Sequence, residues 1–239
     1  MDTKKWTYLE DGQTTPRNSE WQERPGASPV EELTVLSDSL RELGVDRIEQ
    51  KYRTLQSDWN DTVIGLRDLT ASCAGRIPMP DGFFVGSAER SAAFAVVCRL
   101  LVGAEKHVYE LRRLTAAGAA LQTEAQGMFS AEALLEHRIC AAKVHCRQRQ
   151  DNPELMQAAE QIWQEFEAQR VRLRDVYGAI SSFCEAAVYF SSSVWSDFCN
   201  RMGNLADTLH EGAACDPRGA GQLCGELISF LDRTQAKSK

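Results

Sequence analysis

The chain lacks the sequence signatures of common catalytic sites. It contains no Gly-x-Ser-x-Gly turn, no phosphate-binding loop, no Rossmann glycine fingerprint and no His-Glu-x-x-His motif. The serine groups at 181–182 and 191–193 have no histidine near them in the sequence. We therefore expect a protein that is not an enzyme and that uses no cofactor.

Paired cysteine motifs are also missing, although the chain has eight cysteines. The densest cluster of possible metal ligands is His137, Cys140, His145 and Cys146. At about 100° per residue on a helix, the first three span about 140°, whereas Cys146 points away. Because a structural zinc site needs four converging ligands, we predict no metal site and cysteines that are reduced and mostly buried.

Long apolar runs are absent as well. The N-terminal residues MDTKKWTYLEDGQ have no apolar core of the kind that secretion requires, and runs such as Phe94–Val97 are far too short to span a membrane. This pattern predicts a cytoplasmic protein. The net charge of −7 argues against a general nucleic-acid-binding protein, but it leaves room for a local basic patch.

The sequence shows no strand pattern of any length, and its apolar residues recur at helical spacing. Residues 1–28 are polar and contain Pro16 and Pro25, so we predict a flexible leader. Ser28, Pro29 and Glu31 form a capping box at the start of a first long helix, whose apolar stripe extends to Cys73. A turn at 76–86 leads to a second helix, for which we expect a kink or break at Gly127.

A third helix follows a turn at Asn152 and carries the clearest heptad pattern. Between Leu155 and Val194, only Gln169 is polar among the twelve core positions. After Val194 the apolar stripe continues with an offset of four residues. We predict an all-α fold in which residues 29–212 form three long antiparallel helices in an elongated coiled-coil bundle, followed by a short tail helix within 213–239.

Folding the second and third helices together at Asn152 pairs residues whose numbers sum to about 300. The segments AAFAVVCRLLVGA and YFSSSVWSDFCNRM then face each other, and both are apolar on several faces. Because three helices cannot bury so much apolar surface, we expect a second chain to cover it. The predicted dimer interface consists of Phe94, Val97, Leu101, Phe190, Val194, Trp195 and Phe198.

Basic residues gather near the hairpin between the second and third helices. We expect the first helix to reach only to about residue 127, which would leave 128–175 as a bare two-helix arm. Arg138 should lie close to Arg170 across this arm. Acidic residues also lie there, so a solvated charged face is the alternative to an anion-binding tip. The candidate lipid-binding residues are Arg138, Lys143, Arg147, Arg149, Arg170, Arg172 and Arg174.

Three long helices, an apolar centre and a basic two-helix tip resemble a BAR domain, and most closely the C-terminal BAR domains of sorting nexins. The resemblance covers about residues 30–210. The residues that carry it are Leu134, Leu135, Ala141, Ala142, Lys143, Arg147 and Arg149 on the second helix, and Phe166, Arg170, Val171, Arg174 and Trp195 on the third. It implies a dimer that forms a curved membrane scaffold.

Two departures from the family qualify what the resemblance implies. The connection between the arginines of the second helix and Phe166 is short, which would give stubby arms. Residues 1–28 are too short for the phosphoinositide-binding PX domain of sorting nexins. The sequence is therefore expected to be either an excised domain or a stand-alone protein, and endosomal sorting is in doubt for the latter.

We expect a dimeric membrane-binding scaffold that senses or induces curvature in intracellular trafficking. Its expected partners are a second identical or related chain, an anionic membrane surface and other trafficking proteins, but not nucleic acid. It would be peripheral on intracellular membranes, endosomal where the sorting-nexin resemblance holds. The alternative is a non-enzymatic helical adaptor or structural subunit of a larger complex, such as a tether, a cytoskeletal adaptor or a kinetochore part.

Overall fold

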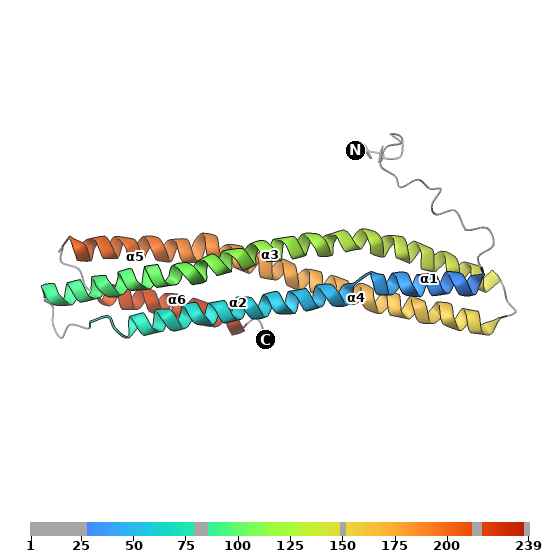
Figure 1. Cartoon of the computed structure of the whole chain (residues 1–239), viewed down its shortest axis with the longest axis horizontal. Helices are drawn as coiled ribbons and strands as arrows, with labels where there is room; N and C mark the ends of the chain where they lie inside the picture. Colours follow the sequence, from blue (N-terminus) through green and yellow to red (C-terminus); the bar gives the residue numbers. More distant parts are fainter. Residues whose placement is uncertain (1–27, 79–85, 149–151, 212–216, 237–239) are drawn as a thin grey trace, which may run out of the picture. The chain divides into compact units, whose positions relative to one another are not determined.

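The computed structural model describes residues 28–78, 86–148, 152–211 and 217–236. These residues form α-helices and one π-helix and contain no strand, which confirms the all-α prediction (Figure 1). The elements are α1 (Pro29–Glu42), α2 (Val45–Ala74), α3 (Ser87–Gln148), α4 (Pro153–Tyr189), the π-helix η3 (Phe190–Val194), α5 (Trp195–His210) and α6 (Arg218–Ala236). The predicted leader up to residue 27 and the turn residues 79–85 lie outside the described residues.

The chain divides into two compact units. Unit 1 combines Met1–Glu42 with Leu134–Phe166, and unit 2 combines Leu43–Ala133 with Glu167–Lys239. The long helices α3 and α4 each contribute residues to both units. We describe each unit by itself.

In unit 1, α1 packs against the end of α3 and the start of α4. Its buried core is formed by Leu33, Leu36, Leu40, Leu135, Ile139, Ala142, Cys146, Ala159, Ile162 and Phe166. The predicted capping box is present, because the backbone N–H of Ser28 donates to Glu31 at 2.9 Å and that of Glu31 donates to the Ser28 hydroxyl at 3.3 Å. The predicted bare two-helix arm is wrong, since α1 covers this part of the hairpin as a third helix.

A glycine separates α1 from α2. Gly44 has a φ of 75°, a left-handed conformation that only glycine adopts without a steric cost. The continuous first helix predicted from the apolar stripe is therefore two helices. By contrast, α3 is continuous through Gly127, so the break that was one alternative there is wrong, whereas the kink stays a prediction.

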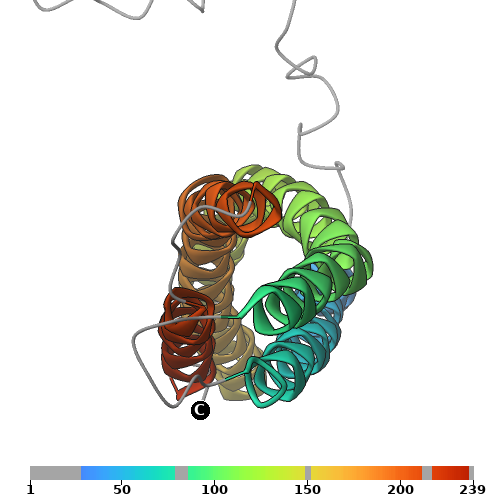
Figure 2. The same ribbon diagram turned by 90° about the vertical axis from the view of Figure 1, so that its left-hand side faces the viewer.

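Unit 2 contains a fourth packed helix. The predicted tail helix exists as α6, and it packs against both α2 and α5 (Figure 2). The ring of Phe230 stacks on that of Phe190, with centroids 6.0 Å apart, and Leu223, Leu227 and Leu231 are buried. Helix α6 of the same chain thus covers part of the apolar surplus for which we expected a second chain.

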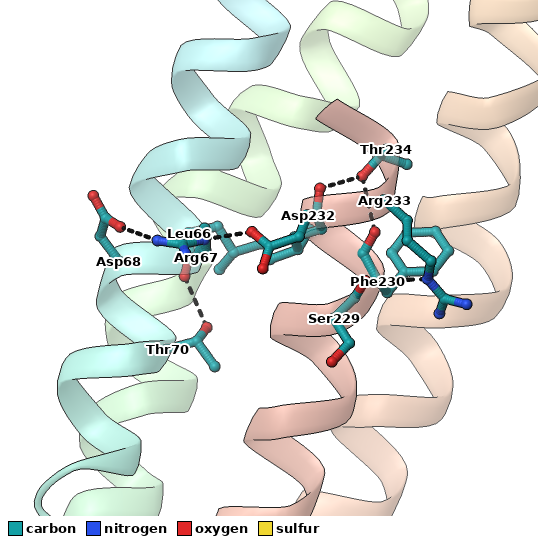
Figure 3. A network of polar contacts seen from close by, with 10 residues as sticks. Leu66, Arg67, Asp68, Thr70, Ser229, Phe230, Asp232, Arg233 and Thr234 are labelled. Carbon is teal, nitrogen blue, oxygen red and sulfur yellow. Dashed lines mark hydrogen bonds and ion pairs between the residues drawn. The ribbon is translucent and has the colours of Figure 1, made fainter. Parts of the chain in front are cut away.

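Polar contacts hold the end of α6 beside α2 (Figure 3). The Arg67 guanidinium lies between two carboxylates, with Nε 2.5 Å from Asp232 Oδ1 on α6 and Nη1 3.1 Å from Asp68 Oδ1. Hydrogen bonds to these carboxylates, first to Asp232, raise the pKa of Arg67. The fully buried Thr70 hydroxyl on α2 donates to the Leu66 carbonyl at 2.7 Å, so this threonine leaves no unsatisfied polar group in the core.

The predicted pairing of the second and third helices is confirmed in both units. Gln122 Nε2 donates to Ser181 Oγ at 2.9 Å in unit 2, and Lys143 Nζ lies 2.9 Å from Glu160 Oε2 in unit 1. Both pairs of residue numbers sum to about 300, as expected of a hairpin that turns at Asn152.

The π-helix η3 occupies the position of the predicted offset in the heptads. The hydroxyls of Ser191 and Ser192 donate to the carbonyls of Ala187 and Val188, at 2.8 and 2.7 Å. Such bonds from a serine to the fourth residue before it compete with the helical ladder. This local rearrangement lets the apolar stripe continue into α5, where Phe198, Met202 and Leu209 are buried.

Candidate interaction surfaces

The predicted lipid-binding residues have very different surroundings in the structure. Arg149 lies outside the described residues. The other six belong to both units, with Arg138, Lys143 and Arg147 in unit 1 and Arg170, Arg172 and Arg174 in unit 2. The predicted approach of Arg138 to Arg170 joins the two units and stays a prediction.

Arg172 on α4 is engaged by carboxylates of α2. Its Nε donates to Glu49 Oε1 at 2.9 Å, and its Nη2 donates to Glu49 Oε2 at 2.8 Å. The same Nη2 also contacts Asp46. Hydrogen bonds to Glu49 and then to Asp46 raise the pKa of the Arg172 guanidinium. Because the Arg172 guanidinium already binds both carboxylate oxygens of Glu49, Arg172 links α4 to α2 within unit 2.

Arg170 is also engaged within unit 2. Its Nε lies 2.9 Å from Oε1 of the buried Glu132, and its Nη1 lies 3.3 Å from Glu167 Oε1. The N–H of Nε is not aligned with Glu132 for a hydrogen bond, so this contact is an ion pair by proximity. A buried carboxylate needs an opposite charge, and Arg170 supplies it.

In unit 1, Lys143 is packed rather than extended into solvent. Its ammonium lies 2.9 Å from Glu160 Oε2 and 4.8 Å from the centroid of the Trp163 ring. Only 17% of the Lys143 side chain is exposed. Both contacts hold the Lys143 ammonium against unit 1. Arg138, on the same helix, is half-buried.

Arg147 and Arg174 differ from the rest of the set. Both are exposed, and neither forms an ion pair with another residue of the described ranges. An arginine side chain keeps its charge at any physiological pH and can bind phosphate through two parallel N–H donors. Of the predicted residues that the structure describes, these two are the most available to an anionic ligand.

The predicted dimer interface is only partly accessible. Val97, Phe190, Trp195 and Phe198 are buried among the helices of their own unit, so their apolar character does not require a second chain. The argument that led to the dimer is wrong on this point, because α6 was not counted as a core helix. The remaining members, Phe94, Leu101 and Val194, are half-buried.

A shallow groove lies between α1 and α4 in unit 1. It encloses about 400 Å³ and is lined by Val30, Leu33, Thr34, Ser37, Asp38, Arg41, Leu155, Ala158, Gln161, Ile162 and Glu165. Its lining mixes apolar side chains with polar and charged ones. At the rim, Arg41 Nη1 lies 3.3 Å from Asp38 Oδ1.

The outer face of α3 near its start is a surface that the sequence analysis missed. Val102 and Tyr109 are 68% and 71% exposed, and Arg99, Lys106 and Arg112 are exposed around them. Their spacing of three, four and seven residues was the available signal, because it places them on one side of a helix. The apolar neighbours in AAFAVVCRLLVGA concealed it.

Two kinds of site are not found in the described part of the chain. No group of three or more His, Cys, Asp or Glu residues there could hold a metal ion. The helices of the described ranges include none that is long and apolar enough to cross a membrane. In the cluster singled out from the sequence, Cys146 is buried, Cys140 is exposed, and His145 Nδ1 lies 3.8 Å from Glu32.

Comparison of the chain with protein-family models, with curated proteins and with solved structures found no match. The likeness to BAR domains therefore rests on the sequence pattern alone.

Proposed function

We propose that this protein is a non-enzymatic helical scaffold that binds the anionic surface of intracellular membranes. The observation that carries the proposal is the exposure of Arg147 and Arg174, which have no ion pair within the described residues. Basic side chains close to an anionic leaflet each contribute about 1 kcal/mol to binding. Two arginines alone give weak binding, so further basic residues or a second copy must take part.

The proposal includes a dimer of the BAR type acting in membrane trafficking. Two copies would double the number of basic side chains that meet one membrane and would raise the apparent affinity without any new kind of contact. The half-buried Phe94, Leu101 and Val194 are the predicted interface residues that a second chain could still reach.

Co-sedimentation of the full chain with vesicles tests this function. The variant Arg147→Glu/Arg174→Glu should lose most of its binding to vesicles that contain phosphatidylserine. The control variant Arg76→Glu/Arg233→Glu makes the same change of charge at two other exposed positions and should bind like the wild type. A wild-type chain that stays in the supernatant with anionic vesicles at low salt overturns the proposal.

A helical adaptor in a protein complex is the second candidate function. It is favoured by the internal ion pairs of Lys143, Arg170 and Arg172, which make structural contacts of three of the seven predicted basic residues. An adaptor would bind a protein segment, and the groove between α1 and α4 is the described cavity suited to one. Val30→Glu in the groove should then abolish binding to a purified partner, whereas Arg147→Glu should not.

A further inference from the structure

The first half of α3 exposes apolar side chains where a helix of a bundle normally carries polar ones. Tyr109 and Val102 are the two most exposed large hydrophobic residues of the described ranges, at 71% and 68%. They are seven residues apart and therefore lie on the same side of the helix, one above the other. Single exposed apolar residues need no explanation, but two on one face form the start of a patch.

The same face is basic. Arg99, Lys106 and Arg113 repeat at intervals of seven residues beside Val102 and Tyr109, and Arg112 is exposed next to them. Of the two acidic residues in this segment, Glu110 is bound to Arg113 by hydrogen bonds of 3.0 Å to each carboxylate oxygen. Glu105 is the other. Residues 99–113 thus carry four basic and two acidic side chains, although the whole chain has a net charge of −7.

The packing on the opposite side of α3 fixes which face points outward. Leu100, Ala104 and Leu111 are fully buried in the core of unit 2. The Leu69 side chain of α2 lies against Gly103, and the His107 ring lies so close to Gly65 that a Cβ atom there would be 2.6 Å from it. With α3 held in this way, Val102 and Tyr109 cannot turn inward to bury themselves.

We propose that the outer face of α3 from Arg99 to Arg113 is an interfacial membrane-binding surface. Val102 and Tyr109 would enter the headgroup region of the bilayer, while Arg99, Lys106 and Arg112 bind lipid phosphates. The inference rests on the proposed function, but it assigns membrane contact to residues other than Arg147 and Arg174.

The chemistry of the face favours an anionic lipid surface over an acidic protein. Tyrosine places its ring at the boundary of a bilayer with its hydroxyl in water, and long basic side chains extend toward the phosphates above an apolar surface. A fluid bilayer needs no matching shape, whereas the anchors of a protein interface sit in pockets. The groove between α1 and α4 in unit 1 is not part of this face.

The basic and the apolar side chains of this face should contribute to vesicle binding with different dependence on salt concentration. Attraction between Arg99 or Lys106 and the phosphates is screened, so its contribution should fall between low and physiological ionic strength. Entry of Val102 and Tyr109 into the interface is driven by burial of apolar area and should persist at higher salt. A membrane surface built from both should therefore bind anionic vesicles in part even at physiological salt.

Vesicle co-sedimentation of the full chain tests the inference with vesicles of phosphatidylcholine, with and without phosphatidylserine. Arg99→Glu/Lys106→Glu should weaken binding to the anionic vesicles about tenfold or more, since two attractions become repulsions. Val102→Ser/Tyr109→Ser should bind nearly normally at low salt but lose most of its binding at physiological salt. All four positions are exposed, so the variants should fold, and circular dichroism and thermal melts verify this.

The variant Arg147→Glu/Arg174→Glu separates this inference from the proposed function. If both α3 variants bind like the wild type while Arg147→Glu/Arg174→Glu does not, the protein binds membranes but the inference is wrong. If the wild type ignores anionic vesicles at low salt, the proposed function itself fails, and the inference fails with it. The inference is supported if Arg99→Glu/Lys106→Glu binds anionic vesicles more weakly and Val102→Ser/Tyr109→Ser loses most of its binding at physiological salt.

Discussion

Arg172 on α4 donates hydrogen bonds to both carboxylate oxygens of Glu49 on α2, at 2.9 and 2.8 Å. The two residues are 123 positions apart in the sequence, so this link joins elements that meet only in the folded chain. An arginine that the sequence places on a lipid-binding surface is therefore part of the bundle.

Arg172→Ala should lower the free energy of unfolding by about 1 kcal/mol, because it removes a bidentate pair whose partner Glu49 is largely covered. The matched control is Arg53→Ala, since Arg53 is 72% exposed and its Nη2 lies 3.7 Å from the same carboxylate. Urea denaturation measures both. Equal effects of the two substitutions would contradict a structural role for the Arg172 fork.

A methyl group at Gly65 should destabilise the contact between α2 and α3. In Gly65→Ala the new Cβ would stand 2.6 Å from the His107 ring, which would have to move, so we expect a loss of about 1–3 kcal/mol. Gly178→Ala on α4 is the control, because no atom lies within 4 Å of its added Cβ. That substitution should stabilise the chain by about 0.5–1 kcal/mol in a denaturation experiment, as alanine favours the helix. If Gly65→Ala and Gly178→Ala changed the free energy of unfolding in the same direction, the predicted contact between Gly65 and the His107 ring would be refuted.

His107 should make stability depend on pH. Burial, and then the charge of Lys106, lower the pKa of His107 below its ordinary value of 6.5. The folded state therefore disfavours the protonated imidazole. The stability that the neutral His107 side chain contributes is complete above pH 6.5 and is lost as the pH falls toward the lowered pKa.

The measurement compares the wild type with His107→Gln by urea denaturation at about pH 7.5 and about pH 5. The stability of the wild type relative to the variant should fall with the pH, and other titrating groups cancel in the comparison. A difference that stays constant or grows toward acid pH would show that the imidazole is not held neutral.

The ring of Phe230 should be needed for the whole of unit 2. Phe230→Ala removes the stack on Phe190 and leaves a cavity between α6 and η3, for which we expect a loss of about 2–4 kcal/mol. Ser229→Ala, on the exposed side of the same helix, should change stability by less than about 0.5 kcal/mol. Thermal melts followed by circular dichroism measure both variants. A separate early transition in both would show that α6 is only loosely attached, which would contradict the prediction.

The local signals in the sequence predicted the helices well. The Ser28–Glu31 capping box is present, and the Asn152 side chain accepts hydrogen bonds from the backbone N–H groups of Glu154 and Leu155 at 3.1 and 3.4 Å. Both caps act over two or three residues, so the sequence contains all the information that they need.

The errors concern choices that depend on tertiary packing. A glycine in an apolar stripe is compatible with a continuous helix, as at Gly127, or with a left-handed break, as at Gly44, and the surrounding contacts decide between them. The position of α6 and the partners of Arg170 and Arg172 also depend on residues far away in the sequence. Omitting α6 led to the expectation of a second chain, and the unseen carboxylate partners of Arg170 and Arg172 made both arginines look available to an anionic ligand.

Binding of the wild-type chain to vesicles of increasing anionic lipid content, measured by flotation at low and at physiological salt, tests the central claim most directly. The account predicts that the bound fraction rises with the share of phosphatidylserine, falls with salt and does not vanish at physiological ionic strength. Equal binding to neutral and anionic vesicles, or no binding at low salt, would contradict it.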